Sequence, residues 1–195
     1  MSTKTCKEIQ AGRAPKYLHW ARKYGAVSGV DPYLILAYAK HESGFTPDIY
    51  NKSCRKKNPL SYATVCAAGL TQMPYKYYTK YVSSPGQLLD PETNIRVFAA
   101  SLARLIKKFG SEYKGMLAGH WGYGNMIRHV RGDSKYRVIP SRPKRYVNSV
   151  MALRDRYKSC LGGVGASAPG GSLTNLLLLG AASGLGWLLY KRLKG

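Results

Sequence analysis

One carboxyl group in this sequence stands where acid chemistry needs it. Glu42 closes the apolar run that starts at Leu34, and after Asp48 no aspartate or glutamate appears until Asp90. A carboxyl group beside apolar side chains is partly desolvated, which raises its pKa and keeps a proton available for a leaving group near neutral pH. The alternative is a solvated glutamate that pairs with Lys40 or another base. We interpret Glu42 as a general acid without a second carboxylate beside it.

The helix that must position Glu42 is marked at both ends. Asp31 is suited to cap its N-terminus, and Pro32 is tolerated in the first turn, where its missing N–H is not needed. Tyr38 and Glu42 lie one turn apart, on or beside the apolar stripe. Gly44 can end the helix in the left-handed conformation. The pattern therefore predicts a helix from Pro32 to just before Gly44, with Glu42 in its last turn.

Five segments occur in the order in which the soluble lytic transglycosylase family carries them. Glu42-Ser43-Gly44-Phe45 resembles the family's Glu-Ser-x-Phe motif, and residues 68–74 resemble its Gly-Leu-Met-Gln segment. Residues 89–95 resemble its Asp-Pro-x-x-Asn-Ile helix start, and residues 145–147 its late Tyr-Val helix. Residues 118–125 resemble its Ala-Tyr-Asn-Ala-Gly segment more weakly. The resemblance to this lysozyme-like family covers residues 15–158.

The resemblance implies a mechanism that needs only one carboxyl group. Glycoside cleavage usually uses two, and the second candidate here, Asp48, follows Pro47 in a sequence typical of a turn. In the family's reaction the N-acetyl group of muramic acid attacks its own anomeric carbon while the acid, here Glu42, protonates the glycosidic oxygen. Glu42 then deprotonates the C6 hydroxyl, and a 1,6-anhydro ring closes without water. We expect a peptidoglycan lytic transglycosylase that cleaves the MurNAc-GlcNAc β-1,4 bond, with a hydrolytic lysozyme as the nearest alternative.

Six further residues are candidates for binding the glycan, by resemblance to the family: Ser43, Asn51, Gln72, His120, Trp121 and Tyr146. Gln72 offers a donor and an acceptor, and Tyr146 is able to hydrogen-bond and orient Glu42. The rings of His120 and Trp121 can stack on a sugar. The structural alternatives are a solvated loop glutamine, a core tyrosine, and packing within a glycine-rich loop. His120-Trp121 replaces Tyr-Asn of the family pattern and Asn51 replaces a serine, so the outline of the sugar pocket stays open.

The remaining pattern predicts a mainly α-helical, lysozyme-like domain over residues 1–161. An apolar stripe over residues 17–24 ends at Gly25, and apolar residues recur at steps of three and four over residues 95–109. No segment shows sustained period-two alternation. We expect at most a short β element near residues 52–66, which look like an insertion.

Four cysteines are expected to form two disulfides. Cys54 and Cys66 bracket the insertion, and Cys6 and Cys160 lie at the two ends of the domain, where chain termini are often close. No histidine neighbours a cysteine pair, so the spacing matches no zinc signature, and we expect no metal or other cofactor. Two disulfides would indicate an oxidising compartment, and the alternative is four reduced thiols.

The composition of the chain changes after the domain. Residues 162–172 are rich in Gly, Ser and Ala, which is typical of a flexible linker. Leu173–Tyr190 is an uncharged run of 18 residues, near the minimum for a transmembrane helix, and residues 191–195 form a basic tail. The positive-inside rule puts that tail in the cytoplasm and the enzyme in the periplasm, facing the cell wall. An amphipathic or core helix is the alternative.

The charge of the chain is strongly positive. It has 31 Lys and Arg residues against 9 Asp and Glu residues, a formal net charge of +22. Besides the peptidoglycan substrate, the expected partners are a lipid bilayer, reached through Leu173–Tyr190, and an anionic genome or other virion proteins, reached through the basic surface.

Delivery to the cell wall is inferred from the beginning of the sequence. Residues 1–13 are polar and charged and contain no apolar signal core. We therefore expect a component of a phage particle that acts on the wall when the phage infects a cell. One alternative is a host inner-membrane protein for lysis or for a secretion machine. Another is a virion membrane protein or nucleic-acid binder without activity, although no nucleic-acid recognition motif is present.

Overall fold

A computed structural model describes residues 3–57 and 60–163 of the chain. Its elements in chain order are α1 (Thr3–Ala11), α2 (Ala14–Ser28), α3 (Pro32–Ser43), α4 (Lys52–Lys57), α5 (Tyr62–Val65), β1 (Ala67–Ala68), β2 (Met73–Pro74), η1 (Tyr75–Tyr77), η2 (Pro85–Leu89), α6 (Pro91–Phe109), α7 (Glu112–Trp121), α8 (Tyr123–Val130), η3 (Ser134–Tyr136) and α9 (Ser141–Leu161). The domain is mainly α-helical, as the sequence predicted.

The predicted membrane segment, Leu173–Tyr190, lies outside the described residues, as do residues 164–172 of the predicted linker and the basic tail, residues 191–195. Across residues 3–57 and 60–163, no helix is both long and apolar enough to span a bilayer. The linker and the membrane segment therefore stay predictions from the sequence.

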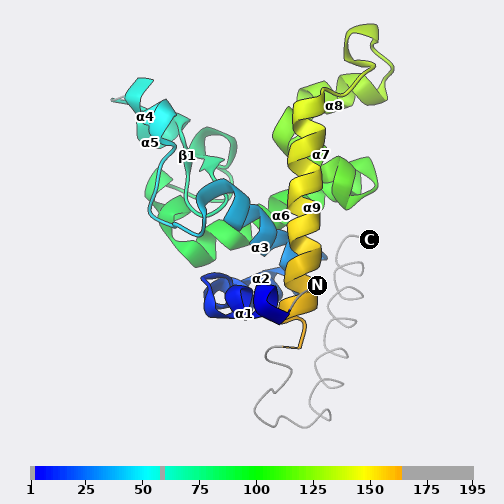
Figure 1. Ribbon diagram of the computed structural model, residues 1–195. Coiled ribbons are helices and arrows are strands. Elements are labelled where there is room, and N and C mark those ends of the chain that lie inside the picture. Colours follow the sequence, from blue (N-terminus) through cyan, green and yellow to red (C-terminus); the bar gives the residue numbers. More distant parts are fainter. Residues whose placement is uncertain (1–2, 58–59, 164–195) are drawn as a thin grey trace, which may run out of the picture. The chain divides into compact units, whose positions relative to one another are not determined.

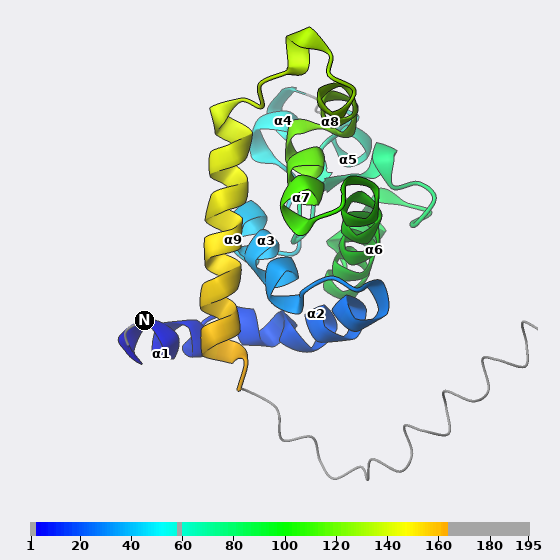
Figure 2. The same cartoon turned by 90° about the vertical axis from the view of Figure 1, so that its right-hand side faces the viewer.

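Helix α3 is the central helix of the domain. Both α2 and α9 pack against it, α2 also packs against α6, and α6 packs against α7. Figures 1 and 2 show α9 as a long helix running beside α3, with α1 near one of its ends. The side chains of Leu34, Ile35, Leu36 and Ala37 are fully buried, so α3 is enclosed on every face at its middle. This packing fixes the direction in which its last turn, which holds Glu42, points.

The ends of α3 follow from its local sequence. The carboxylate of Asp31 accepts a hydrogen bond from the backbone N–H of Tyr33 (2.8 Å), and Pro32 is the first helical residue. Gly44 ends the helix in the left-handed conformation, with φ 62°. The predicted bounds and caps of this helix are confirmed.

Helix α2 differs from the prediction at Gly25. The apolar stripe was expected to end there, but the helix continues to Ser28 and ends at Gly29, which has φ 71°. Gly25 is buried inside the helix, and a Cβ atom at this position would lie 2.6 Å from the carbonyl oxygen of Val30. Gly25 therefore permits a close backbone approach and does not end the helix.

A short hairpin joins the helices near the insertion. Strands β1 and β2 pair antiparallel, with Ala67 opposite Pro74 and Ala68 opposite Met73. The Oδ1 atom of buried Asn94 accepts hydrogen bonds from the N–H (3.0 Å) and the hydroxyl (2.7 Å) of Thr71, within the hairpin turn. Its Nδ2 donates to the carbonyls of Ala68 (3.2 Å) and Leu88 (2.7 Å). Asn94 thus fastens the hairpin to the first turn of α6.

Both predicted disulfides are present. Cys6 pairs with Cys160, which ties α1 to the end of α9, and Cys54 pairs with Cys66, which ties α4 to the start of the hairpin. The first crosslink joins residues 154 positions apart and the second joins residues 12 positions apart.

Candidate active site

Glu42 lies in the last turn of α3 with its side chain half-buried. The hydroxyl of Tyr146, from α9, donates a hydrogen bond to Oε1 of Glu42. Burial raises the pKa of Glu42 above its ordinary value, against the lowering effects of the Tyr146 hydrogen bond and of the nearby His41 charge. The carboxyl group therefore holds its proton to a higher pH than a free glutamate does, which suits a general acid.

The Tyr146 ring is held from two sides. His120 stacks on it with ring centroids 3.7 Å apart and an interplanar angle of 9°, and His41 meets it edge-on at 4.6 Å. Burial lowers the pKa of His120, and the positive charge of Arg142 lowers it further. These rings orient the hydroxyl that contacts Glu42. His120 stacks here on a protein ring, and its stacking on a sugar stays a prediction.

Tyr38 is a site residue that the sequence did not single out as functional. It lies one helical turn before Glu42 and meets the Tyr146 ring edge-on, with centroids 6.0 Å apart. Burial raises the pKa of Tyr38, and the Glu42 charge raises it further, so the two groups interact electrostatically. The spacing of four residues was a signal that could have identified it, because such residues share a helix face.

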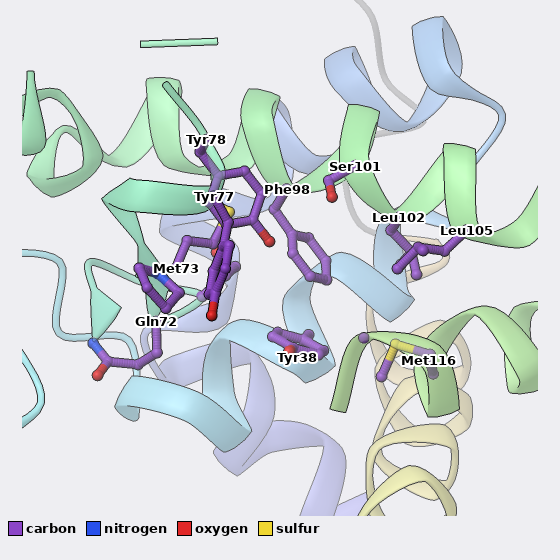
Figure 3. Close-up of a pocket in the computed structure, with 13 residues that line it drawn as sticks. Tyr38, Gln72, Met73, Tyr77, Tyr78, Phe98, Ser101, Leu102, Leu105 and Met116 are labelled. Carbon is purple, nitrogen blue, oxygen red and sulfur yellow. The ribbon is translucent and has the colours of Figure 1, made fainter. Parts of the chain in front are cut away.

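A cavity of about 190 Å³ adjoins this cluster. Tyr38 forms part of its wall, and so does Gly119, the residue before His120. Figure 3 shows the rings of Tyr38, Phe98 and Tyr77 gathered around it. Tyr77 is 68% exposed and stands at the opening. Aromatic walls with a few polar groups are typical of saccharide and other small-molecule sites.

Gln72 also lines the cavity, but its amide is turned toward the backbone. Its Nε2 donates to the carbonyls of Gly69 (2.8 Å) and Ile49 (3.3 Å), and Figure 3 shows the amide directed away from Tyr38. Gln72 has φ 49°, in the left-handed region that residues other than glycine seldom adopt. No described residue donates a hydrogen bond to its Oε1, and a role of Gln72 in binding the glycan stays a prediction. The Gln72 side chain therefore stabilises the turn through these hydrogen bonds, unlike the solvated loop glutamine that was the structural alternative.

Ser43 and Asn51 make local hydrogen bonds. The Ser43 hydroxyl donates to the carbonyl of Ala39 (3.1 Å) and accepts from the N–H of Thr46 (3.2 Å). The exposed side chain of Asn51 accepts from the N–H of Cys54 (2.9 Å), at the start of α4. Both contacts organise the backbone around the site, and a role in binding the glycan stays a prediction for each.

The segment around His120 and Trp121 is helical, so the alternative of packing within a glycine-rich loop is wrong, and a role of either residue in binding the glycan stays a prediction. Both residues belong to α7, which is capped by Ser111 and ends at Gly122, with φ 106°. The Trp121 ring contacts His129 and Tyr136, with centroids 6.0 and 6.1 Å away. The structure thus brings His120 to Tyr146 but turns Trp121 toward the segment that follows α7.

The environment of Asp48 is that of a surface turn. It is exposed, and its charge acts on Tyr17, whereas no second carboxylate of the described residues contributes to the pKa shift of Glu42. The described residues also contain no group of three His, Cys, Asp or Glu side chains arranged to hold a metal ion.

The chain is similar to known proteins in both sequence and fold. The family model of the transglycosylase SLT domain matches residues 19–138. The soluble lytic murein transglycosylases of Escherichia coli (strain K12) and Escherichia coli O157:H7 are each 28% identical to this chain over 158 residues, covering 72% of this chain and 23% of the relatives. The crystal structure of the 70 kDa soluble lytic transglycosylase from Escherichia coli superposes with a TM-score of 0.60 at 25% identity, covering 74% of this chain and 24% of that one. The chain thus spans about a quarter of the length of these relatives.

Proposed function

We propose that this chain, which belongs to the transglycosylase SLT domain family, is a lytic transglycosylase that cleaves the MurNAc-GlcNAc β-1,4 bond of peptidoglycan. The names of the two curated relatives support peptidoglycan as the substrate. The single observation that carries the proposal is the state of Glu42. It is a half-buried acid with a raised pKa that accepts a hydrogen bond from the Tyr146 hydroxyl, and Tyr38, one helical turn before it, lines an aromatic cavity.

The proposed mechanism uses Glu42 twice. As an acid it gives its proton to the glycosidic oxygen, the bond from that oxygen to the MurNAc C1 breaks, and the acetamido oxygen of the same MurNAc attacks C1. As a carboxylate it then takes the proton of the C6 hydroxyl, O6 attacks C1, and the acetamido group is released. The products are 1,6-anhydroMurNAc and a free GlcNAc end, and water is not consumed. One carboxyl group is sufficient because the substrate supplies the nucleophile.

Digestion of purified peptidoglycan followed by mass spectrometry of the muropeptides tests this proposal. Products with 1,6-anhydroMurNAc ends, one water lighter than hydrolysed products, are expected. Reducing MurNAc ends would replace the proposal with a hydrolytic lysozyme, and undigested wall would favour a binding or structural protein.

The sequence also supports a proposal about anchoring. Leu173–Tyr190, an uncharged run followed by Lys191, Arg192 and Lys194, would hold the enzyme in a bilayer with its catalytic domain facing the wall. Flotation of the full chain with lipid vesicles is expected, and it should be lost when Leu177→Arg and Leu178→Arg are introduced together. Flotation of the double variant at the wild-type level would overturn the proposal that Leu173–Tyr190 anchors the protein in a bilayer.

Carriage in a phage particle rests on the sequence alone. In this role the enzyme would act on the wall during infection, and its basic surface would contact the genome or other virion proteins. The chain should then copurify with intact particles. Peptide mass spectrometry of purified particles is the direct measurement, and a chain found only in the inner membrane of host cells would contradict this role.

A further inference from the structure

Helix α4 is short, strongly basic and buries none of its residues. Four of its six residues, Lys52, Arg55, Lys56 and Lys57, are cations. An isolated helix of this length is not stable in water, and α4 has no apolar face with which to pack. Figure 1 shows it projecting from the body of the domain. We call Lys52–Lys57 the basic lobe.

Contacts that do not depend on a hydrophobic core connect the basic lobe to the residues that follow it. The disulfide between Cys54 and Cys66 crosslinks it to the residue before β1. The guanidinium of Arg55 lies over the ring of Tyr62, 4.8 Å from its centroid. Covalent and cation–π contacts therefore replace the burial that would ordinarily stabilise a helix, and they keep the lysines in solvent.

These connections lead to the wall of the cavity. The ring of Tyr62 meets that of Tyr50 edge-on at 5.0 Å, and Tyr50 forms a β-bridge with Ala68 in the hairpin. The hairpin continues through Gln72 and Met73, which line the cavity. A chain of contacts through Tyr62 and Tyr50 thus connects the basic lobe to the hairpin that lines the cavity.

The cations of the lobe are uncompensated. Residues 49–89 contain six Lys and Arg residues and no Asp or Glu. Among the residues that the structure describes, no carboxylate forms an ion pair with any cation of the lobe, whereas Lys23 pairs with Glu92 and Arg154 with Glu112, each at 2.7 Å. A further cation, Arg142 at the start of α9, acts on His120, whose pKa its charge lowers. Cations without neighbouring carboxylates favour an anionic ligand.

We propose that the basic lobe binds free carboxylates of the peptide stems of peptidoglycan, and that the enzyme therefore prefers wall whose stems are not amidated. The inference rests on the proposed function, because it takes peptidoglycan as the substrate of the same site. Stem carboxylates recur along each glycan strand, so a lobe beside the cavity meets them while the strand occupies the site. Exposed lysines suit repeated, loosely placed carboxylates, since an ammonium group imposes little geometry on its partner.

The test compares two substrates and three proteins. The substrates are peptidoglycan freed of phosphate polymers and the same material after its carboxylates have been amidated chemically. The proteins are the full chain, the variant Lys52→Gln/Lys56→Gln/Lys57→Gln, and the control Lys107→Gln/Lys108→Gln/Lys114→Gln, which removes the same charge from exposed positions on α6 and α7. Arg55 is kept because it contacts Tyr62. Both cleavage and cosedimentation with wall are measured.

The full chain and the control are expected to cleave and bind unmodified wall about tenfold better than amidated wall at low salt, a value consistent with three exposed ion pairs. The preference should fade above about 0.5 M salt, where exposed charges are screened. The lobe variant is expected to treat both substrates alike. Because α4 buries nothing, neutral substitutions there leave the fold intact, and the comparison of substrates on the full chain needs no variant.

The outcomes separate this inference from the proposed function. Cleavage of both substrates at equal rates by the full chain overturns docking at the lobe and leaves the transglycosylase intact. Binding that prefers unmodified wall, without any cleavage, supports the lobe and overturns the enzymatic proposal. Loss of the preference to the same extent in the control variant shows a general charge effect and also overturns docking at the lobe.

Discussion

The Tyr146 hydroxyl donates its hydrogen bond to Glu42 across 104 residues of sequence, from the first half of α9 to the last turn of α3. The contact joins the two helices at the point where the reaction is proposed to occur. Because His120 and His41 hold the Tyr146 ring, the position of the Glu42 carboxyl group depends on three separate segments of the chain.

Replacement of the acid is the most direct mutational test. Glu42→Gln keeps the size of the side chain and an acceptor for Tyr146 but cannot donate a proton to the glycosidic oxygen. Release of muropeptides should fall by a factor of about 10² to 10⁴, the usual contribution of a general acid. Cosedimentation with peptidoglycan should be unchanged, and activity retained near the wild-type level would overturn the assignment of Glu42.

Tyr146→Phe should shift the pH dependence of cleavage. The Tyr146 hydrogen bond lowers the pKa of Glu42, so its loss should raise that pKa further. The acid would then stay protonated to a higher pH, and the alkaline limb of the kcat/KM profile should shift to higher pH. A loss of about ten- to a hundredfold in rate is also expected, because a hydrogen bond to a charged group typically contributes about 1.5–3 kcal/mol.

Tyr123→Phe is the matched control for this profile. Tyr123 is 53% exposed on α8, and its substitution should leave both limbs of the pH profile in place. An unchanged alkaline limb in Tyr146→Phe would show that the hydroxyl does not tune the acid.

Glu42→Gln should also stabilise the fold at neutral pH. Burial raises the pKa of Glu42 in the folded state above its value in the unfolded chain. Its contribution to stability is therefore fully present below the unfolded pKa of about 4.3 and is lost as the pH rises through the folded-state pKa. Glutamine does not ionise, so the variant should melt above the wild type at pH 7, by about 2–4 °C for each kcal/mol. The two melting curves should converge near pH 4, and Asp48→Asn, at an exposed turn position, should show no such trend.

The two disulfides should contribute unequally to stability. In the chain-entropy description, a crosslink between residues 154 positions apart stabilises by about 5 kcal/mol and one between residues 12 positions apart by about 3 kcal/mol. Cys6→Ser/Cys160→Ser should therefore lower the denaturant midpoint more than Cys54→Ser/Cys66→Ser does. Chemical denaturation with and without reductant measures both effects, and the opposite order would show that α1 is not an integral part of the cooperative fold.

Asn94 should be essential for the joint between the hairpin and α6. Asn94→Leu leaves the N–H of Thr71 and the carbonyls of Ala68 and Leu88 without their buried partner. The free energy of unfolding is expected to fall by about 3 kcal/mol or more, since each unsatisfied buried group costs about 1–3 kcal/mol. Asn148→Leu, at an exposed position on α9, should change the melting temperature little. Equal melting temperatures of the two variants would show that Asn94 does not stabilise the contact between the hairpin and α6.

Much of the local structure could be predicted because its signals are local. Asp31, Pro32 and Gly44 bound α3, and Asp90 caps α6 by accepting from the N–H of Thr93 (2.8 Å) while Gly110 ends it with φ 82°. Caps, helix-ending glycines and apolar periodicity act within a few residues, so they can be recognised without knowledge of the packing. The burial of Glu42 followed from the same periodicity.

The sequence by itself determined that a single carboxyl group would end a buried helix of a mainly helical domain with two disulfides. The packing of α9 against α3, and of α7 against α9, decided which side chains would surround that carboxyl group. It brought Tyr146 to Glu42 and His120 to Tyr146, and the turn at Gln72 directed its amide to the backbone. Gly25 was expected to end a helix, but it lies inside α2, where the carbonyl oxygen of Val30 approaches it closely. These features depend on pairings between segments far apart in sequence, and no rule of spacing along the chain specifies such pairings.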